Sequence, residues 1–236
     1  MIGAGGLGGP ALLTLAQGGV ARVALVECDA VETSNLNRQP LFGEADLGSR
    51  KAAAAAARLR ALFPALQVDV HDERFSAANA LPLLSGVGVV VDGSDSFATK
   101  FLANDAARRA GVPLVHGGVL RTTAQVLTVA PGGLGGCLRC LFEAPPPEGS
   151  VPSCSQAGIL GPVAGFAGAL MGAEALRLLA GERGAYDGRL LTYEARSGKS
   201  RLVLVRKRPG CPACAGTQPL EDAPAPACAT ASGGGA

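Results

Sequence analysis

The sequence predicts an α/β fold in which helices cover both faces of a doubly wound, mostly parallel sheet. Three observations predict it. A glycine-rich turn, Gly3 to Pro10, opens a helix at the start of the chain. Strand-like and helix-like patterns then alternate up to about residue 118, as in a parallel sheet with crossover helices. Later strand patterns lie close together, which predicts antiparallel strands in the C-terminal part.

The glycine turn fits the pattern G-x-G-x-x-G at Gly3, Gly5 and Gly8. Glycine lets the backbone turn tightly and approach a ligand, and the free N–H groups at a helix start favour a phosphate. The helix is predicted from about Pro10 to Gly18, with Pro10 in its first turn. A glycine-rich helix entry without a ligand would have the same sequence, so both interpretations stay open.

A buried strand, Arg22 to Val26, follows and ends at Glu27. An acid about 20 residues after the glycine pattern commonly holds a ribose hydroxyl. Only Met1 and Ile2 precede the glycine turn, although this turn normally follows a strand that is central in the sheet. We therefore expect a gap with unpaired ladder groups in the middle of the sheet, and expect the natural protein to begin further upstream.

The polar loop from Cys28 to Gln39 leaves the carboxyl end of that strand, where open α/β sheets bind ligands. Asn35 and Arg38 lie one helical turn apart and can point at one place, although a simply solvated loop is the alternative. The next helix runs to about Leu62, with Ser49 as its predicted N-cap. Lys51 in its first turn opposes the helix dipole unless an anion lies nearby; an exposed lysine is the alternative.

Further strands are predicted at Gln67–His71, Val87–Asp92 and Pro113–Gly118, with a helix from Phe97 to Ala110. Asp95 lies between strand and helix, where it can be an N-cap or a Mg²⁺ ligand. Asp92 has the same two interpretations, and His71 is expected to be structural or exposed.

Strands at Gln125–Val129, Arg189–Ala195 and Arg201–Lys207 are predicted to be antiparallel, the last two as a hairpin. The apolar region Ile159–Ala180 contains a proline, an acid and an arginine, which favours a core helix over a membrane span. We expect one domain over residues 1–215 and a disordered tail over residues 216–236, in which Cys228 is incidental.

Two C-x-x-C pairs, Cys137/Cys140 and Cys211/Cys214, are the clearest metal signal. Four thiolates suit tetrahedral Zn²⁺ in a closed structural site. Disulfides or a thioredoxin-like redox role for the second pair are the alternatives, but the redox role needs a strand–helix context and this pair precedes the tail. Seven cysteines without a visible secretion signal predict a reducing compartment.

Composition excludes some classes of protein. The chain has 236 residues, 48% of them hydrophobic and 17% charged, which is enough for a substantial core. Its net charge of +2, two tyrosines and absence of tryptophan argue against a nucleic-acid-binding protein.

Together these residues resemble the ThiF/MoeB adenylyltransferases, bacterial relatives of ubiquitin-activating enzymes. The resemblance covers Met1 to about Cys214. It rests on the glycine pattern, the acid Glu27, the loop Ser34–Gln39, and further motifs in the same order: Lys51, Asp95, both C-x-x-C pairs, and Cys154 ahead of Gly158–Pro162.

The resemblance implies a Rossmann-like fold with a Cys₄ zinc site and ATP-dependent adenylation of a small ubiquitin-like sulfur carrier (ThiS/MoaD type) ending in Gly-Gly, for thiamine or molybdopterin biosynthesis. It also implies a cytoplasmic homodimer without nucleic-acid or membrane partners. The implied cofactors are ATP, Mg²⁺ and Zn²⁺. The residues implied to bind the nucleotide are Gly3, Gly5, Gly6, Gly8, Glu27, Asp29, Asn35, Arg38, Lys51 and Asp95, and those implied in catalysis are Arg38, Lys51, Asp95 and Cys154.

The sequence departs from the family pattern at several points. The N-terminal helix and first strand are missing, together with an arginine that reaches the partner subunit's nucleotide. Glu27 replaces the more usual Asp, Ser96 stands where Asn is usual, and no rhodanese domain follows Cys214. Cys154 matches a cysteine used for sulfur transfer in the thiazole branch and not needed in the molybdopterin branch.

Three alternatives to this function remain. A relative that adenylates a tRNA-modification intermediate is expected to lack the zinc and Cys154 pattern. An NAD-dependent Rossmann oxidoreductase would not need Lys51 or Arg38. A truncated, inactive scaffold would bind the carrier without activating it.

Overall fold

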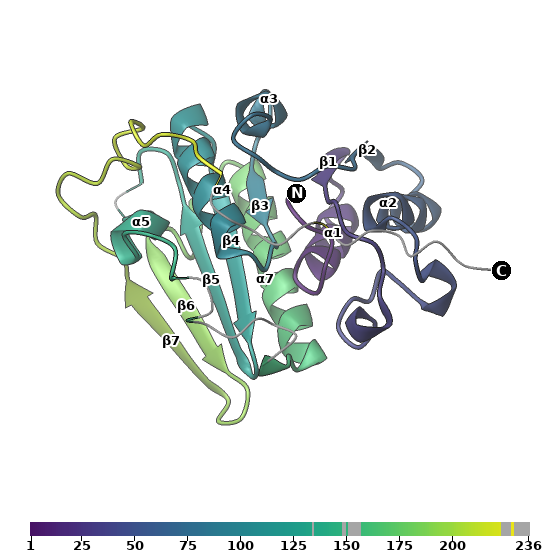
Figure 1. Ribbon diagram of the computed structural model, residues 1–236. Coiled ribbons are helices and arrows are strands. Elements are labelled where there is room, and N and C mark those ends of the chain that lie inside the picture. Colours follow the sequence, from purple (N-terminus) through teal and green to yellow (C-terminus); the bar gives the residue numbers. More distant parts are fainter. Residues whose placement is uncertain (134, 148–149, 151–156, 223–227, 229–236) are drawn as a thin grey trace.

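The computed structural model describes residues 1–133, 135–147, 150, 157–222 and 228. Its sheet has two parts (Figure 1), a parallel pair β1-β2 and a five-stranded sheet in the order β3-β4-β5-β6-β7. The β3–β4 pair is parallel and the following three pairs are antiparallel, as predicted. The strands are β1 (Arg22–Val26), β2 (Gln67–His71), β3 (Val90–Asp92), β4 (Leu114–Leu120), β5 (Thr123–Val129), β6 (Arg189–Glu194) and β7 (Lys199–Leu204).

The helices lie on both faces of the sheet, which confirms the predicted α/β class (Figure 1). The α-helices are α1 (Gly8–Gln17), α2 (Lys51–Leu62), α3 (Ala80–Leu84), α4 (Phe97–Ala110), α5 (Leu138–Leu141) and α7 (Gly161–Leu179), and two 3₁₀ turns cover Thr33–Asn35 and Glu44–Asp46. Helix α4 ends at Gly111, whose φ of 68° is the left-handed conformation that glycine adopts most easily.

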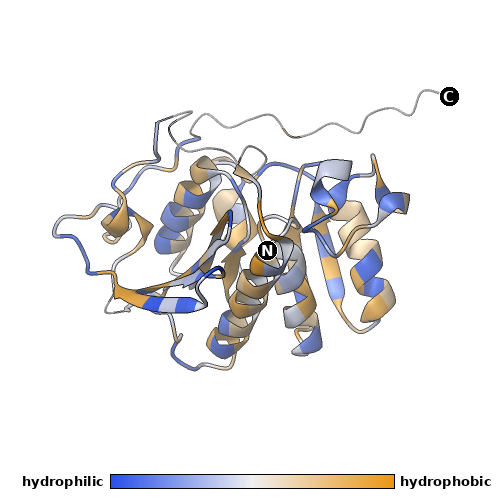
Figure 2. Cartoon of the chain, turned by 90° about the horizontal axis from the view of Figure 1, so that it is seen from below, coloured by the Kyte–Doolittle hydropathy of each residue, from blue (hydrophilic) through white to orange (hydrophobic). Residues whose placement is uncertain are grey.

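The core follows the two-residue period of the strands. Val90 of β3 packs in the same cluster as Leu102 of α4, whereas the next residue, Val91, packs with Met171 of α7. Successive side chains of a strand point to opposite faces, so β3 joins two hydrophobic layers. Figure 2 shows hydrophobic residues concentrated in this packed interior.

The expected gap lies between β1 and β3, where Ile2 alone makes parallel bridges to both strands. Ile2 donates its N–H to the Val91 carbonyl at 2.9 Å, and Gly3 donates to the Val26 carbonyl at 2.8 Å. The Met1 amine donates to the Ala24 carbonyl at 2.7 Å, and burial lowers the pKa of this amine to about 5. The two parts of the sheet are therefore connected through a two-residue segment.

Helices α1 and α7 pack in close contact beneath this junction. A Cβ at Gly168 would overlap the Leu7 carbonyl oxygen, and one at Gly172 would lie 2.6 Å from the Thr14 Cβ. Among the described residues α7 is the one helix long and apolar enough to cross a membrane by length and composition. Its contacts with α1 and the sheet are those of a core helix, as the sequence predicts.

Two local predictions are wrong. Ser49 does not cap α2, because the residue at the N-cap is Arg50, in extended backbone and without a side-chain capping bond. Cys228 is not incidental, because it forms a disulfide with Cys28. Within the predicted tail, Asp222 also accepts a hydrogen bond from the Ala77 N–H at 2.9 Å.

Candidate nucleotide site

One cavity of about 360 Å³ opens at the carboxyl ends of β1 and β3, beside the start of α1. It lies at the sheet edge where open α/β folds bind ligands, and its volume is within the range of small-molecule sites. Residues from the glycine turn, the polar loop after β1, the first turn of α2 and the β3–α4 turn line it. The lining residues include Gly3, Gly5, Gly6, Glu27, Cys28, Asp29, Asn35, Arg38, Gln39, Lys51, Arg74, Ser94, Asp95 and Cys228.

The glycine turn is shaped by close backbone packing. Gly3 has a φ of +82°, and a Cβ there would lie 3.3 Å from the Gly93 carbonyl. Gly8 does not line the cavity; a Cβ on Gly8 would overlap the Gly3 carbonyl oxygen. The third glycine of the pattern therefore closes the turn, while Gly5 and Gly6 expose backbone to the cavity.

The Glu27 carboxylate ties the glycine turn to the end of β1. One oxygen accepts the Ala4 N–H at 2.9 Å, and the other accepts the N–H groups of Cys28 and Asp29 at 2.8 and 2.9 Å. Glu27 lines the cavity as predicted for a ribose-binding acid. Its three backbone bonds show an additional structural role, since they hold the position of the turn.

The polar loop brings Asn35 and Arg38 to the cavity through the short 3₁₀ turn Thr33–Asn35. The Arg38 guanidinium donates to the Ser34 carbonyl at 2.7 Å and to the Asn37 side chain at 3.0 Å. Asn35 and Arg38 thus line one cavity, as their spacing predicts.

Gln39 is a cavity residue that the sequence analysis did not select. Its amide N–H donates to Asn35 Oδ1 at 2.7 Å, while its Oε1 is buried without a hydrogen-bond partner among the described residues. A buried polar atom without a partner is costly, so this residue is a candidate for ligand contact. The sequence feature that could have pointed to Gln39 is its position directly after Arg38.

Lys51 is buried, with 5% of its surface exposed, so the alternative of a free, exposed lysine is wrong. Its Nζ lies 3.3 Å from Asp29 Oδ2, and both residues line the cavity. The Asp29 carboxylate therefore supplies part of the negative charge that a lysine in the first turn of a helix needs nearby. A buried ammonium beside the cavity is suited to bind a phosphate.

Asp95 is exposed and lines the cavity, and it does not cap α4. The cap is Ser96, whose hydroxyl accepts the Thr99 N–H at 3.4 Å. The capping interpretation of Asp95 is therefore wrong, and its carboxylate is not used for that purpose.

Asp92 is fully buried beneath the β3–α4 turn. It accepts bonds from His116 Nδ1 at 2.9 Å and from the Ser94 hydroxyl at 2.6 Å, and Lys100 Nζ lies 3.4 Å away. Burial alone would raise the pKa of Asp92, but the charge of Lys100 and the hydrogen bond from His116 outweigh it and hold the pKa well below its usual range. Asp92 is thus a structural carboxylate that fixes the turn carrying Asp95.

The structure brings together most of the residues predicted for the site. Arg38, Lys51 and Asp95 come from three separate segments and line the same cavity. Cys154 lies outside the described residues.

The four cysteines of the C-x-x-C pairs also converge. All four sulfurs lie within 4.8 Å of one another, and none of these cysteines forms a disulfide. The sulfurs of Cys137 and Cys211 are 3.8 Å apart, close to the edge of about 3.8 Å that a tetrahedron with 2.3 Å zinc–sulfur bonds requires. Burial, followed by the neighbouring cysteine thiols, raises the pKa of the Cys137 thiol. The arrangement fits a four-coordinate metal.

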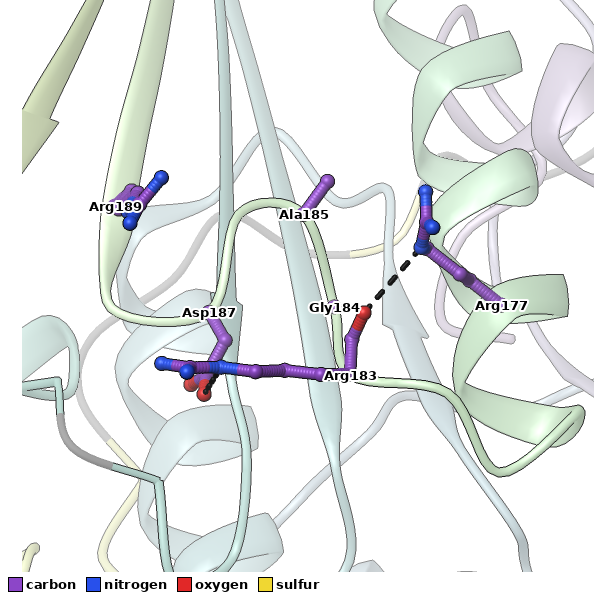
Figure 3. A pocket seen from close by; sticks show the side chains of 6 residues that line it. All are labelled: Arg177, Arg183, Gly184, Ala185, Asp187 and Arg189. Atoms are coloured by element: carbon purple, nitrogen blue, oxygen red, sulfur yellow. Dashed lines mark hydrogen bonds and ion pairs between the residues drawn. The ribbon is translucent and has the colours of Figure 1, made fainter.

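A second cavity, of about 250 Å³, lies at the end of α7 (Figure 3). Its charges are largely paired: Arg183 Nε lies 3.4 Å from Asp187, and Arg177 lies 3.0 Å from Glu182. It has no glycine turn, so the larger cavity is the better nucleotide site.

Comparison with known proteins agrees with this geometry. The chain is 44% identical over 225 residues to a sulfur carrier protein adenylyltransferase of Thermus thermophilus, covering 94% of this chain and 83% of that protein. It is 42% identical to the SAMP-activating enzyme E1 of Haloferax volcanii, covering 94% and 82%. It is 45% identical to the adenylyltransferase and sulfurtransferase MOCS3 of Bos taurus, covering 91% of this chain and 47% of that protein.

A solved structure of E. coli MccB with MccA-N7isoASN has the same fold, with a TM-score of 0.79 and 22% identity over 90% of this chain and 65% of that chain. At this identity the likeness shows the fold alone. The family model described as the ThiF family matches residues 1–213. The chain therefore belongs to the ThiF family.

Proposed function

We propose that the larger cavity binds Mg-ATP and that the chain uses it to adenylate the C-terminal Gly-Gly carboxylate of a small ubiquitin-like sulfur carrier. One observation carries the proposal: Arg38, Lys51 and Asp95 line one cavity beside the glycine turn. Membership of the ThiF family and the names of the Thermus and Haloferax relatives support the same reaction.

The nucleotide would lie with its ribose near Glu27 and its phosphates along the glycine turn. Backbone N–H groups at the start of α1 and the dipole of that helix favour the negative charge. Lys51 would bind a phosphate oxygen from its buried position, and Asn35 and Arg38 would bind further oxygens.

In the reaction, a carboxylate oxygen of the carrier attacks the α-phosphorus of ATP. The new bond joins the acyl oxygen to phosphorus, and the bond from phosphorus to the bridging oxygen of pyrophosphate breaks. The products are the acyl-adenylate and pyrophosphate. Fixed cations beside the phosphates stabilise the negative charge of the transition state, which is how proteins accelerate reactions of this class.

Two metals fit the residues present. Asp95 offers an exposed carboxylate in the lining of the cavity, and Mg²⁺ prefers such oxygen ligands and neutralises phosphate charge when bound. Cys137, Cys140, Cys211 and Cys214 would hold a structural Zn²⁺.

Several finer points belong to the same proposal. We take residues 1–215 as the adenylyltransferase domain and residues 216–236 as a tail, and we expect a cytoplasmic homodimer. The carrier would serve thiamine or molybdopterin biosynthesis, and Cys154 would act in the later sulfur-transfer step. The chain spans about half the length of MOCS3.

The decisive experiment is carrier-dependent ATP–pyrophosphate exchange with reduced, zinc-loaded protein and candidate carriers ending in Gly-Gly. We expect exchange with an intact carrier and none with a carrier lacking its last two glycines. Carrier binding without exchange would instead support the inactive scaffold. NAD reduction with a small-molecule substrate would support the oxidoreductase, and either result would refute the proposal.

A further inference from the structure

A disulfide joins Cys28 and Cys228, which are 200 positions apart in the sequence. Both residues line the proposed nucleotide cavity. The four cysteines of the C-x-x-C cluster are free, so among the described residues this disulfide is the one covalent crosslink. It connects the C-terminal part of the chain to the site of the proposed reaction.

Cys28 lies in a hydrogen-bonded part of that site. Its N–H donates to Glu27 Oε1 at 2.8 Å, and the N–H of the next residue, Asp29, donates to the same oxygen at 2.9 Å. Asp29 in turn lies 3.3 Å from the buried Lys51 ammonium. A bond to the Cys28 sulfur therefore acts on the segment that orders both the predicted ribose acid and the predicted phosphate lysine.

Cys228 is held on the same side by further contacts. Arg74, another cavity residue, donates to the Cys228 sulfur at 3.7 Å. Earlier in the C-terminal segment, Asp222 accepts the Ala77 N–H at 2.9 Å, and the Gln218 carbonyl accepts a bond from Arg109. Gln218 and Asp222, which precede Cys228, are thus attached to the domain by contacts that do not involve the disulfide.

We propose that Cys28 and Cys228 are a reversible thiol–disulfide pair that weakens nucleotide binding when oxidised. The bond keeps Cys228 in the wall of a cavity of about 360 Å³, which is at the small end of ligand sites. Reduction frees Cys228 to leave the wall and releases Cys28 from the crosslink, so that the cavity can admit the nucleotide. In a reducing compartment, disulfides are mostly transient and redox-sensing.

The chemistry needs a two-electron oxidant, for which hydrogen peroxide is the probe. The two thiols lose two protons and two electrons as the sulfur–sulfur bond forms, and the peroxide takes them up to give two molecules of water. A dithiol reverses the step by two thiol–disulfide exchanges and becomes a cyclic disulfide.

The inference rests on the proposed function where it uses carrier-dependent exchange as a readout. The experiment therefore measures both ATP affinity and exchange. Zinc-loaded full-length protein is divided into dithiol-reduced and peroxide-oxidised samples. Affinity for ATP is measured by calorimetry, and carrier-dependent pyrophosphate exchange is measured in parallel. Peptide mass spectrometry under non-reducing conditions identifies the crosslink. Gel filtration removes chains that intermolecular disulfides have joined to one another.

Cys228→Ser is the matched control, because it removes the crosslink and keeps every other cysteine. We expect oxidation to weaken ATP binding by the wild type at least tenfold, with recovery in dithiol. In Cys228→Ser and Cys28→Ser, the peroxide-treated sample should bind ATP with the same affinity as the dithiol-treated sample. Loss of exchange should accompany the loss of binding. If the reduced protein binds ATP but shows no exchange, the proposed function fails while the redox comparison remains valid.

Three results would overturn the inference. The first is a mapped Cys28–Cys228 disulfide with unchanged ATP affinity, and the second is no such disulfide after oxidation. The third is equal inhibition of Cys228→Ser, which would assign the effect to the zinc cysteines or Cys154.

The sulfurs of Cys28 and Cys228 and the Asp29 carboxylate lie within 4.8 Å of one another, so inhibition that a chelator reverses and a dithiol does not would instead indicate metal binding.

Discussion

Lys51 shows how one residue at an unfavourable position can indicate a site. A cation in the first turn of a helix is destabilised by the helix dipole, and here the cation is also 5% exposed. The Asp29 carboxylate at 3.3 Å offsets part of that cost. The position is costly for folding, and under the proposed function a bound phosphate would offset the rest of that cost.

We predict that Lys51→Ala lowers carrier-dependent pyrophosphate exchange by about 10²–10³-fold, the usual cost of losing one group that stabilises transition-state charge. Zinc content should stay at the wild-type value, because Lys51 is remote from the cysteine cluster in the fold. Arg60→Ala, a change on the same helix outside the cavity, is the control. If Lys51→Ala exchanges pyrophosphate at the wild-type rate, Lys51 takes no part in the proposed site.

Asp92 carries the second prediction at this scale. Its folded pKa lies below the ordinary value of 3.8, so its contribution to stability is fully present above about pH 4 and is lost as the pH falls through the folded value. Asp92→Asn leaves the partly buried Lys100 and the buried His116 without their carboxylate, which typically costs about 3–5 kcal/mol.

Denaturant unfolding of the wild type and Asp92→Asn at several pH values measures this contribution. The stability difference should be greatest at neutral pH and should shrink as the pH is lowered below about 4. A difference that does not change with pH would show that packing, and not the charge on Asp92, accounts for it.

At the scale of elements, the contact between α1 and α7 depends on small residues. A Cβ at Gly168 would overlap the Leu7 carbonyl oxygen, whereas Gly165 on the same helix has nothing within 4 Å of the corresponding position. The two glycines therefore have opposite expected responses to alanine.

We predict that Gly168→Ala destabilises the protein by about 1–3 kcal/mol through overpacking. Gly165→Ala should stabilise it by about 0.5–1 kcal/mol, since alanine has the higher helix propensity. Thermal and denaturant unfolding of the pair measure the difference. Equal effects of the two changes would show that α1 and α7 are not in the close contact described.

On the scale of the whole molecule, the cysteine cluster joins segments that are far apart in the chain. Cys137 and Cys140 flank the start of α5, whereas Cys211 and Cys214 follow β7, the outer strand of the five-stranded sheet. A metal held by all four would fasten the C-terminal segment to the rest of the domain.

We predict that Cys211→Ser lowers bound zinc from one ion per chain to near zero and destabilises the protein, because a structural zinc contributes directly to folding. Cys228→Ser should retain its zinc, since that cysteine is outside the cluster. Metal analysis by mass spectrometry after gel filtration checks both. Full zinc occupancy in Cys211→Ser would exclude the four-cysteine site.

The sequence by itself determined the α/β class, the division of the sheet into a parallel and a later antiparallel part, the helix Phe97–Ala110 and the residues at the ends of β1 and β3. These follow from local periodicity and from the rule that parallel strands place their carboxyl ends at one edge. Cap residues were harder to predict: Ser49 and Asp95 are both acceptable cap residues in sequence, but the N-cap positions are Arg50 and Ser96.

Only the tertiary structure decided what long-range contacts bring together. Pairing of Cys28 with Cys228, burial of Lys51 beside Asp29 and the convergence of four separate segments on one cavity depend on parts that are distant in the chain. Local patterns carry no information about such pairings, because a side chain's burial and partners are set by the packing of whole elements. The sequence therefore predicted most of the residues that line the cavity, while the covalent link between that cavity and the C-terminal segment came only from the tertiary structure.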